Sequence, residues 1–98
     1  MVRAVIHQLL ATDIALDKLG ARDITADEAQ QLPRNGHVAV RNPRGGGGRG
    51  ARLLLIGQTD GGRALTLVIE RTVDPTTWLL VTGWSATEPE RKLLEANL

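Results

Sequence analysis

The chain has no cysteine, no phenylalanine and no tyrosine, and only two tryptophans and one methionine among its 98 residues. The absence of cysteine excludes disulfide bonds and thiolate chemistry. Because aromatic side chains are so scarce, the hydrophobic core has to consist of leucine, valine, isoleucine and alanine. At this length we expect a single domain, residues 1–98, that buries roughly two-thirds of the surface of its unfolded chain.

Long hydrophobic runs are also missing. No apolar run reaches the ~20 residues of a membrane-spanning helix, and residues 1–10 contain too little apolar sequence for a secretory signal. The sequence therefore predicts no membrane partner and is compatible with a cytoplasmic location. It contains neither a cluster of residues with metal-ligand spacing nor a Ser-His-Asp set, so we expect no metal and no cofactor.

Acidic residues are missing from residues 29–59, although the net charge of the chain is only +1. This segment contains five arginines, namely Arg34, Arg41, Arg44, Arg49 and Arg52. The flanking segments 1–28 and 70–98 each carry three basic and five acidic side chains. A positive segment of this kind indicates contact with a polyanion or an acidic partner, unless the arginines only solubilise a loop and its strand.

A hairpin of residues 52–58 and 63–71 forms the centre of the predicted sheet. Its two apolar runs flank Asp60-Gly61-Gly62, and glycine adopts the positive φ of a tight turn without steric cost. Neither run alternates strictly between apolar and polar residues. We therefore expect both faces of the hairpin to be at least partly covered.

The strand before this hairpin is predicted over residues 36–41. Its two valines point to a buried face, whereas His37, Ala39 and Arg41 point to a face that we expect to be open. Residues 42–50 then form a glycine-rich loop, which we expect to be flexible because glycine loses the most backbone entropy on ordering. This loop is either a plain hairpin tip or an arginine–glycine arm that contacts phosphates.

The last strand is predicted over residues 78–84, after a turn at Pro75. Strict alternation places Trp78 and Trp84 on the same face, six residues apart. Two interpretations remain open. The indoles either pack beneath a helix, or they form an aromatic platform for a base or for a partner's side chain.

The N-terminal segment is ambiguous. Its apolar residues have the spacing of one helix face, namely Val2, Val5, Ile6, Leu9, Leu10 and Ile14. Alternatively, Thr12 and Asp13 cap a shorter helix over residues 12–19, and residues 2–7 form a strand. We favour the helix over 12–19 and leave 2–11 open, with Gly20 as a left-handed C-cap.

Two capping boxes mark further helix starts. Thr25 and Glu28 form one of them, before a short helix that Pro33 ends. For the C-terminal helix we choose Thr87 over Ser85 as the cap, because Pro89 then falls in the first turn, where its missing N–H is not needed. Together these elements predict an α+β fold: a two-layer domain with a four-stranded antiparallel meander, two N-terminal helices and one C-terminal helix on one face.

Three stretches of this pattern resemble the BrnT family of toxins from bacterial type II toxin–antitoxin systems. Lys18-Leu19-Gly20-Ala21 with Asp27-Glu28-Ala29 resembles the family's K-H-G-V and E-E-A. A second stretch is similar to three further family motifs: R-F-x-L-I-G corresponds to residues 52–57, G-R-x-L to residues 62–65, and V to Val68. Residues 82–86, continuing to Glu90 and Arg91, match the register of its S-A-R-x-A-x-x-x-E-R. The resemblance spans roughly residues 18–91.

The resemblance implies a RelE-like fold and a metal-independent RNA endonuclease that a cognate antitoxin with a DNA-binding region silences, in a complex of the two chains or a homo-oligomer. Such chemistry needs a base for the ribose 2′-OH, cations for the phosphorane and an acid for the leaving oxygen. Arginine suits the cationic role. The resemblance carries over three basic positions, Arg52, Arg63 and Arg91, as catalytic residues, and His37 on the open face of its strand is the candidate base. The candidate RNA-binding residues come from the positive segment and the aromatic platform, namely Arg41, Arg44, Arg49 and Trp84.

The sequence departs from the family pattern at two positions, where Leu19 replaces its histidine and Trp84 its arginine. These departures favour an alternative, a non-catalytic module on the same fold that binds nucleic acid or an antitoxin. For either function we expect Arg41, Arg52 and Arg63 to converge on one exposed patch.

Overall fold

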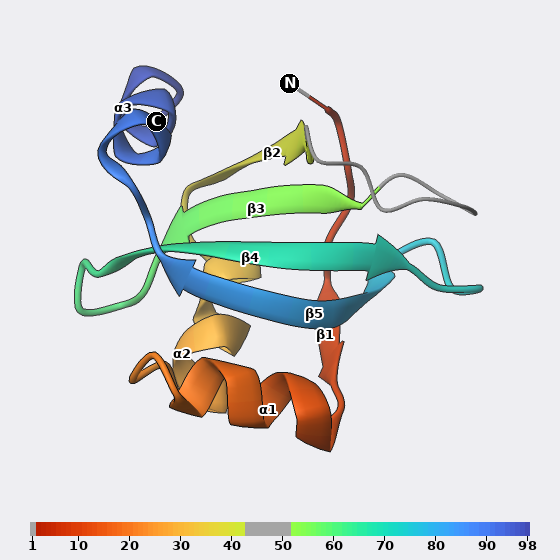
Figure 1. Cartoon of the computed structure of the whole chain (residues 1–98). Coiled ribbons are helices and arrows are strands. Elements are labelled where there is room, and N and C mark those ends of the chain that lie inside the picture. Colours follow the sequence, from red (N-terminus) through yellow and green to blue (C-terminus); the bar gives the residue numbers. More distant parts are fainter. Residues whose placement is uncertain (1, 43–51) are drawn as a thin grey trace.

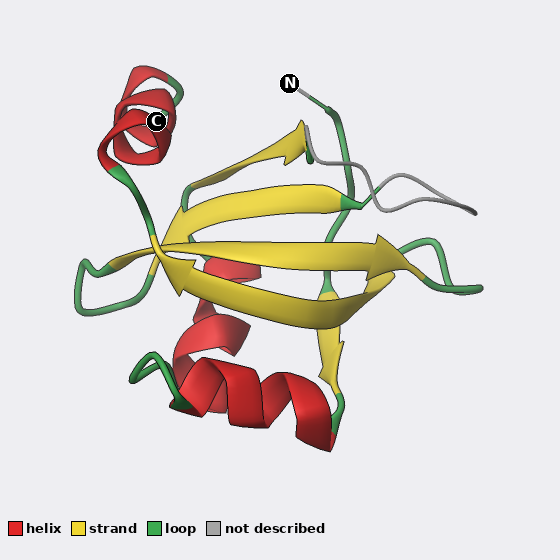
Figure 2. Ribbon diagram, viewed as in Figure 1, coloured by secondary structure: helices red, strands yellow, loops and turns green. Residues whose placement is uncertain are grey.

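The computed structural model of the protein describes residues 2–42 and 52–98. These residues form an α+β fold, as predicted, with one five-stranded sheet (Figures 1 and 2). The strands are β1 (Gln8–Ala11), β2 (His37–Arg41), β3 (Leu53–Gln58), β4 (Ala64–Arg71) and β5 (Thr77–Ser85). The helices are α1 (Asp13–Gly20), α2 (Ala26–Gln31) and α3 (Glu88–Ala96), and a 3₁₀ turn, η1 (Leu32–Arg34), follows α2. Within the two described ranges, no helix is long and apolar enough to cross a membrane.

The β3–β4 hairpin lies in the interior of the sheet, whose strand order is β1-β5-β4-β3-β2. Its register runs from the Leu53–Ile69 pair to the Gln58–Ala64 pair, and Gly62 in the turn has a φ of +86°. Consecutive residues of both strands are buried, so both faces of the hairpin are covered. The predicted hairpin is confirmed.

The sheet has a fifth strand that the predicted four-stranded antiparallel meander lacked. β1 pairs in parallel with β5, so the sheet is mixed. Residues 2–14 therefore do not form one helix. Ile6 and Leu9 are buried, whereas Val5 and Leu10 are exposed.

Residues 2–7 cross one face of the sheet, from β2 at one edge to β5 near the other (Figure 1). The Val2 N–H donates to the Ala39 carbonyl in β2, and the His7 N–H donates to the Thr76 carbonyl just before β5. Ala39 is consequently only 6% exposed. The prediction that its face of β2 is open is wrong, because this segment covers it.

The helices lie on both faces of the sheet, so the predicted two-layer arrangement with all helices on one face is wrong (Figure 1). One face, here the α1 face, packs against α1, α2, η1 and residues 2–7, through a cluster that includes Leu19, Leu32, Leu55 and Leu67. The other, the α3 face, packs against α3, where Leu94 contacts Val38 and Ile56. The reason is that β3 and β4 are apolar on both sides, and a single layer would leave one side in water.

The two tryptophans lie on opposite faces, contrary to the prediction. A bulge interrupts the pairing of β4 with β5, since Val68 lies opposite Thr82 but Ile69 lies opposite Leu80. The extra residue reverses the alternation along β5. Trp78 is 1% exposed in the α1-face core, and its Nε1–H donates to the Val5 carbonyl. Trp84 lies on the α3 face and is only half-buried.

The helix caps are as predicted at their N-termini. Thr12, Thr25 and Thr87 each accept a backbone N–H, and the last two complete capping boxes. The C-terminal end of α1 differs from the prediction, because its left-handed residue is Asp23, with a φ of 57°, rather than Gly20. The Ile24 N–H donates to the Leu19 carbonyl there, which closes a Schellman-type end one turn further on.

A pair of glycine-to-alanine substitutions tests the packing of the α1 face. A Cβ at Gly83 would lie 2.6 Å from the Leu67 Cδ2 and 3.0 Å from the Thr66 carbonyl oxygen, whereas a Cβ at Gly20 would meet no atom within 4 Å. We expect Gly83→Ala to lower the free energy of unfolding by about 1–3 kcal/mol. Gly20→Ala should raise it by up to ~1 kcal/mol. Urea unfolding measures both free energies. Equal changes for Gly83→Ala and Gly20→Ala would contradict the close packing at Gly83.

Candidate nucleic-acid interface

The three arginines expected to converge do not. Arg52 lies opposite Glu70 at the start of β3, and Glu70 is seven residues beyond Arg63, about 23 Å along an extended strand. Arg41 lies near the Arg52 end, but its register partner is Leu53, so it belongs to the α1 face, whereas Arg52 belongs to the α3 face. The predicted single patch is therefore wrong. The other two predicted RNA-binding arginines, Arg44 and Arg49, lie outside the described residues.

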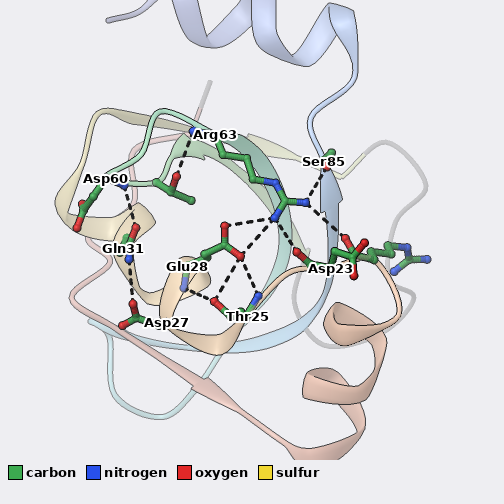
Figure 3. A network of polar contacts seen from close by, with 10 residues as sticks. Asp23, Thr25, Asp27, Glu28, Gln31, Asp60, Arg63 and Ser85 are labelled. Atoms are coloured by element: carbon green, nitrogen blue, oxygen red, sulfur yellow. Dashed lines mark hydrogen bonds and ion pairs between the residues drawn. The ribbon is translucent and has the colours of Figure 1, made fainter.

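Arg63 is the centre of an internal polar network (Figure 3). Its Nη1 donates to the Asp23 carbonyl at 2.7 Å and forms an ion pair with the Glu28 Oε2 at 3.2 Å. Its Nη2 donates to the Ser85 Oγ at 3.2 Å and to the Arg22 carbonyl at 3.4 Å. This guanidinium thus ties the turn between α1 and α2 to the ends of β4 and β5. Its contacts are those of a structural clamp.

The clamp includes the capping box of α2. The Glu28 carboxylate accepts the Thr25 backbone N–H at 3.0 Å and also faces Arg63. The hydrogen bond from the Thr25 backbone, helped by Arg63 and opposed by desolvation, lowers the pKa of Glu28 below its usual value. Glu28 is therefore held as an anion, which matches the guanidinium beside it.

Replacement of Arg63 should destabilise the fold. Arg63→Gln removes the guanidinium that donates to the Asp23 carbonyl and pairs with the Glu28 carboxylate, and we expect a loss of about 1–3 kcal/mol in the free energy of unfolding. The matched control is Arg34→Gln. Arg34 forms an ion pair with Asp60, but its side chain is 63% exposed, so its loss should cost less than ~1 kcal/mol. Urea unfolding measures both losses. If Arg63→Gln and Arg34→Gln lose the same free energy of unfolding, Arg63 does not act as a structural clamp.

A groove on the α3 face contains two of the predicted site residues, Arg52 and Trp84. We call it the indole groove. Its volume is about 540 Å³, and it is lined by Asn42, Arg52, Leu54, Val68, Thr82, Trp84, Thr87 and Glu90. Leu54 and Val68 supply aliphatic surface, Trp84 an aromatic ring, and the other lining side chains are polar or charged. A groove of this composition accepts a flat apolar group beside a charged one.

The Glu90 carboxylate fixes the indole in this groove. One oxygen, Oε1, accepts the Trp84 Nε1–H at 3.1 Å, the Thr66 hydroxyl at 2.9 Å and the Thr87 backbone N–H at 2.8 Å. Burial raises the pKa of Glu90, but the hydrogen bonds from Thr87, Thr66 and Trp84 outweigh it, and the pKa is lowered overall. The indole is therefore held in one orientation by a carboxylate that is charged at neutral pH.

Arg52 lies at the edge of the groove next to Glu70. Its Nε donates to the Glu70 Oε1 at 2.7 Å, and both side chains are about one-third exposed. The Asn42 N–H donates to the Arg52 carbonyl at 3.0 Å. The chain thus leaves β2 and enters β3 at the groove, and residues 43–51 are attached there at both ends.

The remaining predicted residues lie in two other hollows. Arg91 is exposed, has no ion pair among the described residues, and shares a hollow of about 390 Å³ with Arg63. His37 lines a cavity of about 460 Å³ beside Arg3 and Asn97. Arg3 was not predicted as a site residue. It lies in the ambiguous segment 2–11, and only the crossing of the sheet brings it to His37.

No group of three or more histidine, cysteine, aspartate or glutamate side chains that would hold a metal ion occurs among residues 2–42 and 52–98.

Comparison with known proteins adds no relative: no family model, no curated protein and no solved structure matches this chain. The resemblance to BrnT toxins remains a prediction from the sequence.

Stability should fall on acidification. The pKa values of Glu28 and Glu90, as well as those of Asp60 and Asp74, are lowered in the fold by hydrogen bonds that their carboxylates accept. A lowered pKa gives stability that is present above the unfolded value, about 4, and is lost as the pH falls through the folded value. We expect the free energy of unfolding to be nearly constant from pH 7 to about 5 and to fall below that.

The Glu90→Gln variant checks the source of this fall. The substitution removes one carboxyl group whose pKa is lowered by the fold. The free energy of unfolding of the variant should therefore depend less steeply on pH, below about 4.5, than that of the wild type. Glu95→Gln is the control, because this exposed residue of α3 has no ion pair within the described part of the chain. Identical pH profiles for Glu90→Gln and the wild type would contradict the assignment.

Proposed function

We propose that this chain is the toxin of a type II toxin–antitoxin pair, that it cleaves RNA without a metal, and that RNA binds in the indole groove. The resemblance over residues 18–91 supports the class of protein. The groove supports the choice of ligand. It combines a fixed indole, on which a base can stack, with a guanidinium that attracts phosphate.

One observation carries the proposal: Asn42 and Arg52 both line the groove, and residues 43–51 join them. This segment contains Arg44 and Arg49 and no acidic residue. The positive segment of the sequence is therefore attached to the rim of the groove that contains Trp84.

The electrostatics of the groove favour single-stranded over duplex nucleic acid. Glu90 and Glu70 place negative charge beside Trp84 and Arg52, so the described residues do not form the broad basic surface that holds a duplex by its phosphates. Stacking on an indole requires an unpaired base. We therefore expect single-stranded RNA to be the preferred form.

A second candidate function is a non-catalytic module that binds RNA or an antitoxin. It is favoured by the contacts of Arg63, whose guanidinium donates to four groups inside the protein and is not free to stabilise a phosphorane. For the catalytic proposal, the cation has to come from Arg52 or Arg91 instead.

A cleavage assay separates the two candidates. The purified chain is incubated with single-stranded RNA in excess EDTA, and the products are examined for 2′,3′-cyclic phosphate and 5′-hydroxyl ends. The toxin proposal expects cleavage in EDTA and growth arrest on induced expression, relieved by a short adjacent gene that encodes a DNA-binding antitoxin. Intact RNA together with normal growth would leave only the binding module.

Two substitutions of Trp84 test whether single-stranded RNA binds in the indole groove, with the same purified protein and RNA. Trp84→Ala removes the stacking surface and should weaken binding of single-stranded RNA about tenfold, since stacking on one aromatic contributes about 1–3 kcal/mol. Trp84→Phe loses the bond to Glu90 but keeps an aromatic face, and it should bind within about threefold of the wild type. Fluorescence anisotropy at fixed salt measures both. Equal binding by Trp84→Ala and the wild type would rule out the groove.

A further inference from the structure

The cavity beside His37 lies at the opposite end of α3 from Trp84. Trp84, Thr66, Ile56 and Val38 form one row across β5, β4, β3 and β2, because each is the register partner of the next. Three strand spacings separate the ends of this row, about 14 Å. Helix α3 has a similar length, at about 1.5 Å for each of its nine residues. The N-terminus of α3 lies next to Trp84. Asn97 directly follows the C-terminal end of α3 and lines the cavity.

The imidazole of His37 has a defined proton position. Its Nδ1 lies 2.8 Å from the Asn35 backbone carbonyl oxygen, which accepts hydrogen bonds but donates none. The proton of a neutral imidazole therefore resides on Nδ1, and Nε2 carries a lone pair. A neutral His37, which lines the cavity, can therefore accept a hydrogen bond through Nε2.

The carbonyl that orients His37 is itself held in place. The Asn35 side-chain amide donates to the Gln58 carbonyl at 2.9 Å and to the Asp60 Oδ1 at 2.9 Å. Its backbone N–H donates to the Leu32 carbonyl at 3.2 Å. Three hydrogen bonds thus position Asn35, and the place of its carbonyl favours the His37 tautomer with the proton on Nδ1.

The cavity also offers a cation. Arg3 lines it together with His37, and Arg3 forms no ion pair among residues 2–42 and 52–98. The other walls are mostly aliphatic, from Val2, Ala4, Val5, Val38 and Ala39. The cavity thus combines an anion-binding group, a hydrogen-bond acceptor and apolar walls.

We propose that Arg3 and His37 form a ribose–phosphate subsite, in which Arg3 binds a phosphate oxygen and the His37 Nε2 accepts the ribose 2′-OH. This inference rests on the proposed function, because it takes RNA as the ligand. DNA carries the phosphate but lacks the hydroxyl, so on DNA the Nε2 would have no donor. His37 is therefore the residue that makes the protein prefer RNA.

The subsite predicts two different effects in binding assays with an RNA oligonucleotide and its 2′-deoxy counterpart of the same sequence. The wild type should prefer RNA by about 3- to 10-fold, the range expected of one hydrogen bond to a neutral acceptor. His37→Ala should abolish this preference by weakening RNA binding alone. Arg3→Gln should weaken RNA and DNA binding by the same factor, because both carry the phosphate. His7→Ala, at the other histidine, is the control and should leave the preference unchanged.

Two outcomes separate the subsite from the proposed function. If the wild type does not bind RNA, the proposed function fails and the subsite fails with it. If the wild type binds RNA but His37→Ala keeps the preference for RNA over DNA, the subsite alone is wrong. Nitrogen-15 spectra of the wild-type histidines provide a test that needs no variant. They should show His37 with its proton on Nδ1, and a proton on Nε2 of the neutral ring would overturn the inference.

Discussion

The fold depends on the burial of both faces of the β3–β4 hairpin. Every residue from Leu53 to Gly57 is buried, as is every residue from Leu65 to Ile69. With leucine and isoleucine as the main core residues, the hairpin gains its stability from the apolar area removed from water on each side. One side is closed by α1, α2, η1 and the crossing N-terminal segment, and the other by α3. The placement of every other element follows from this requirement.

Local chemistry was sufficient to predict much of this fold. The hairpin turn follows from adjacent glycines, and the starts of α2 and α3 follow from the reach of a threonine hydroxyl and a glutamate carboxylate over one helical turn. The position of Pro89 decided between two possible caps for the same reason. Such features involve residues a few positions apart, so the sequence shows them directly.

Most errors in the predicted fold arise from interactions between distant residues, whereas the end of α1, at Asp23 instead of Gly20, is a local one. The strand β1 exists because β5 offers a free edge, and nothing within residues 8–11 indicates that partner. The two indoles lie on opposite faces because one extra residue near Val81 changes the register against β4. Arg63 was predicted as a site residue because it matches a basic position of the family pattern. Its contacts with Asp23 and Glu28, some 40 and 35 residues earlier, show that its guanidinium serves the fold.

The bond between the Asn42 N–H and the Arg52 carbonyl has a consequence for the indole groove, which both residues line. It holds these two positions next to each other across β2 and β3, so the entropy of bringing them together is already lost when the sheet forms. This part of the groove wall is therefore ordered by the fold itself. A molecule that entered the groove would not have to supply the free energy of ordering it.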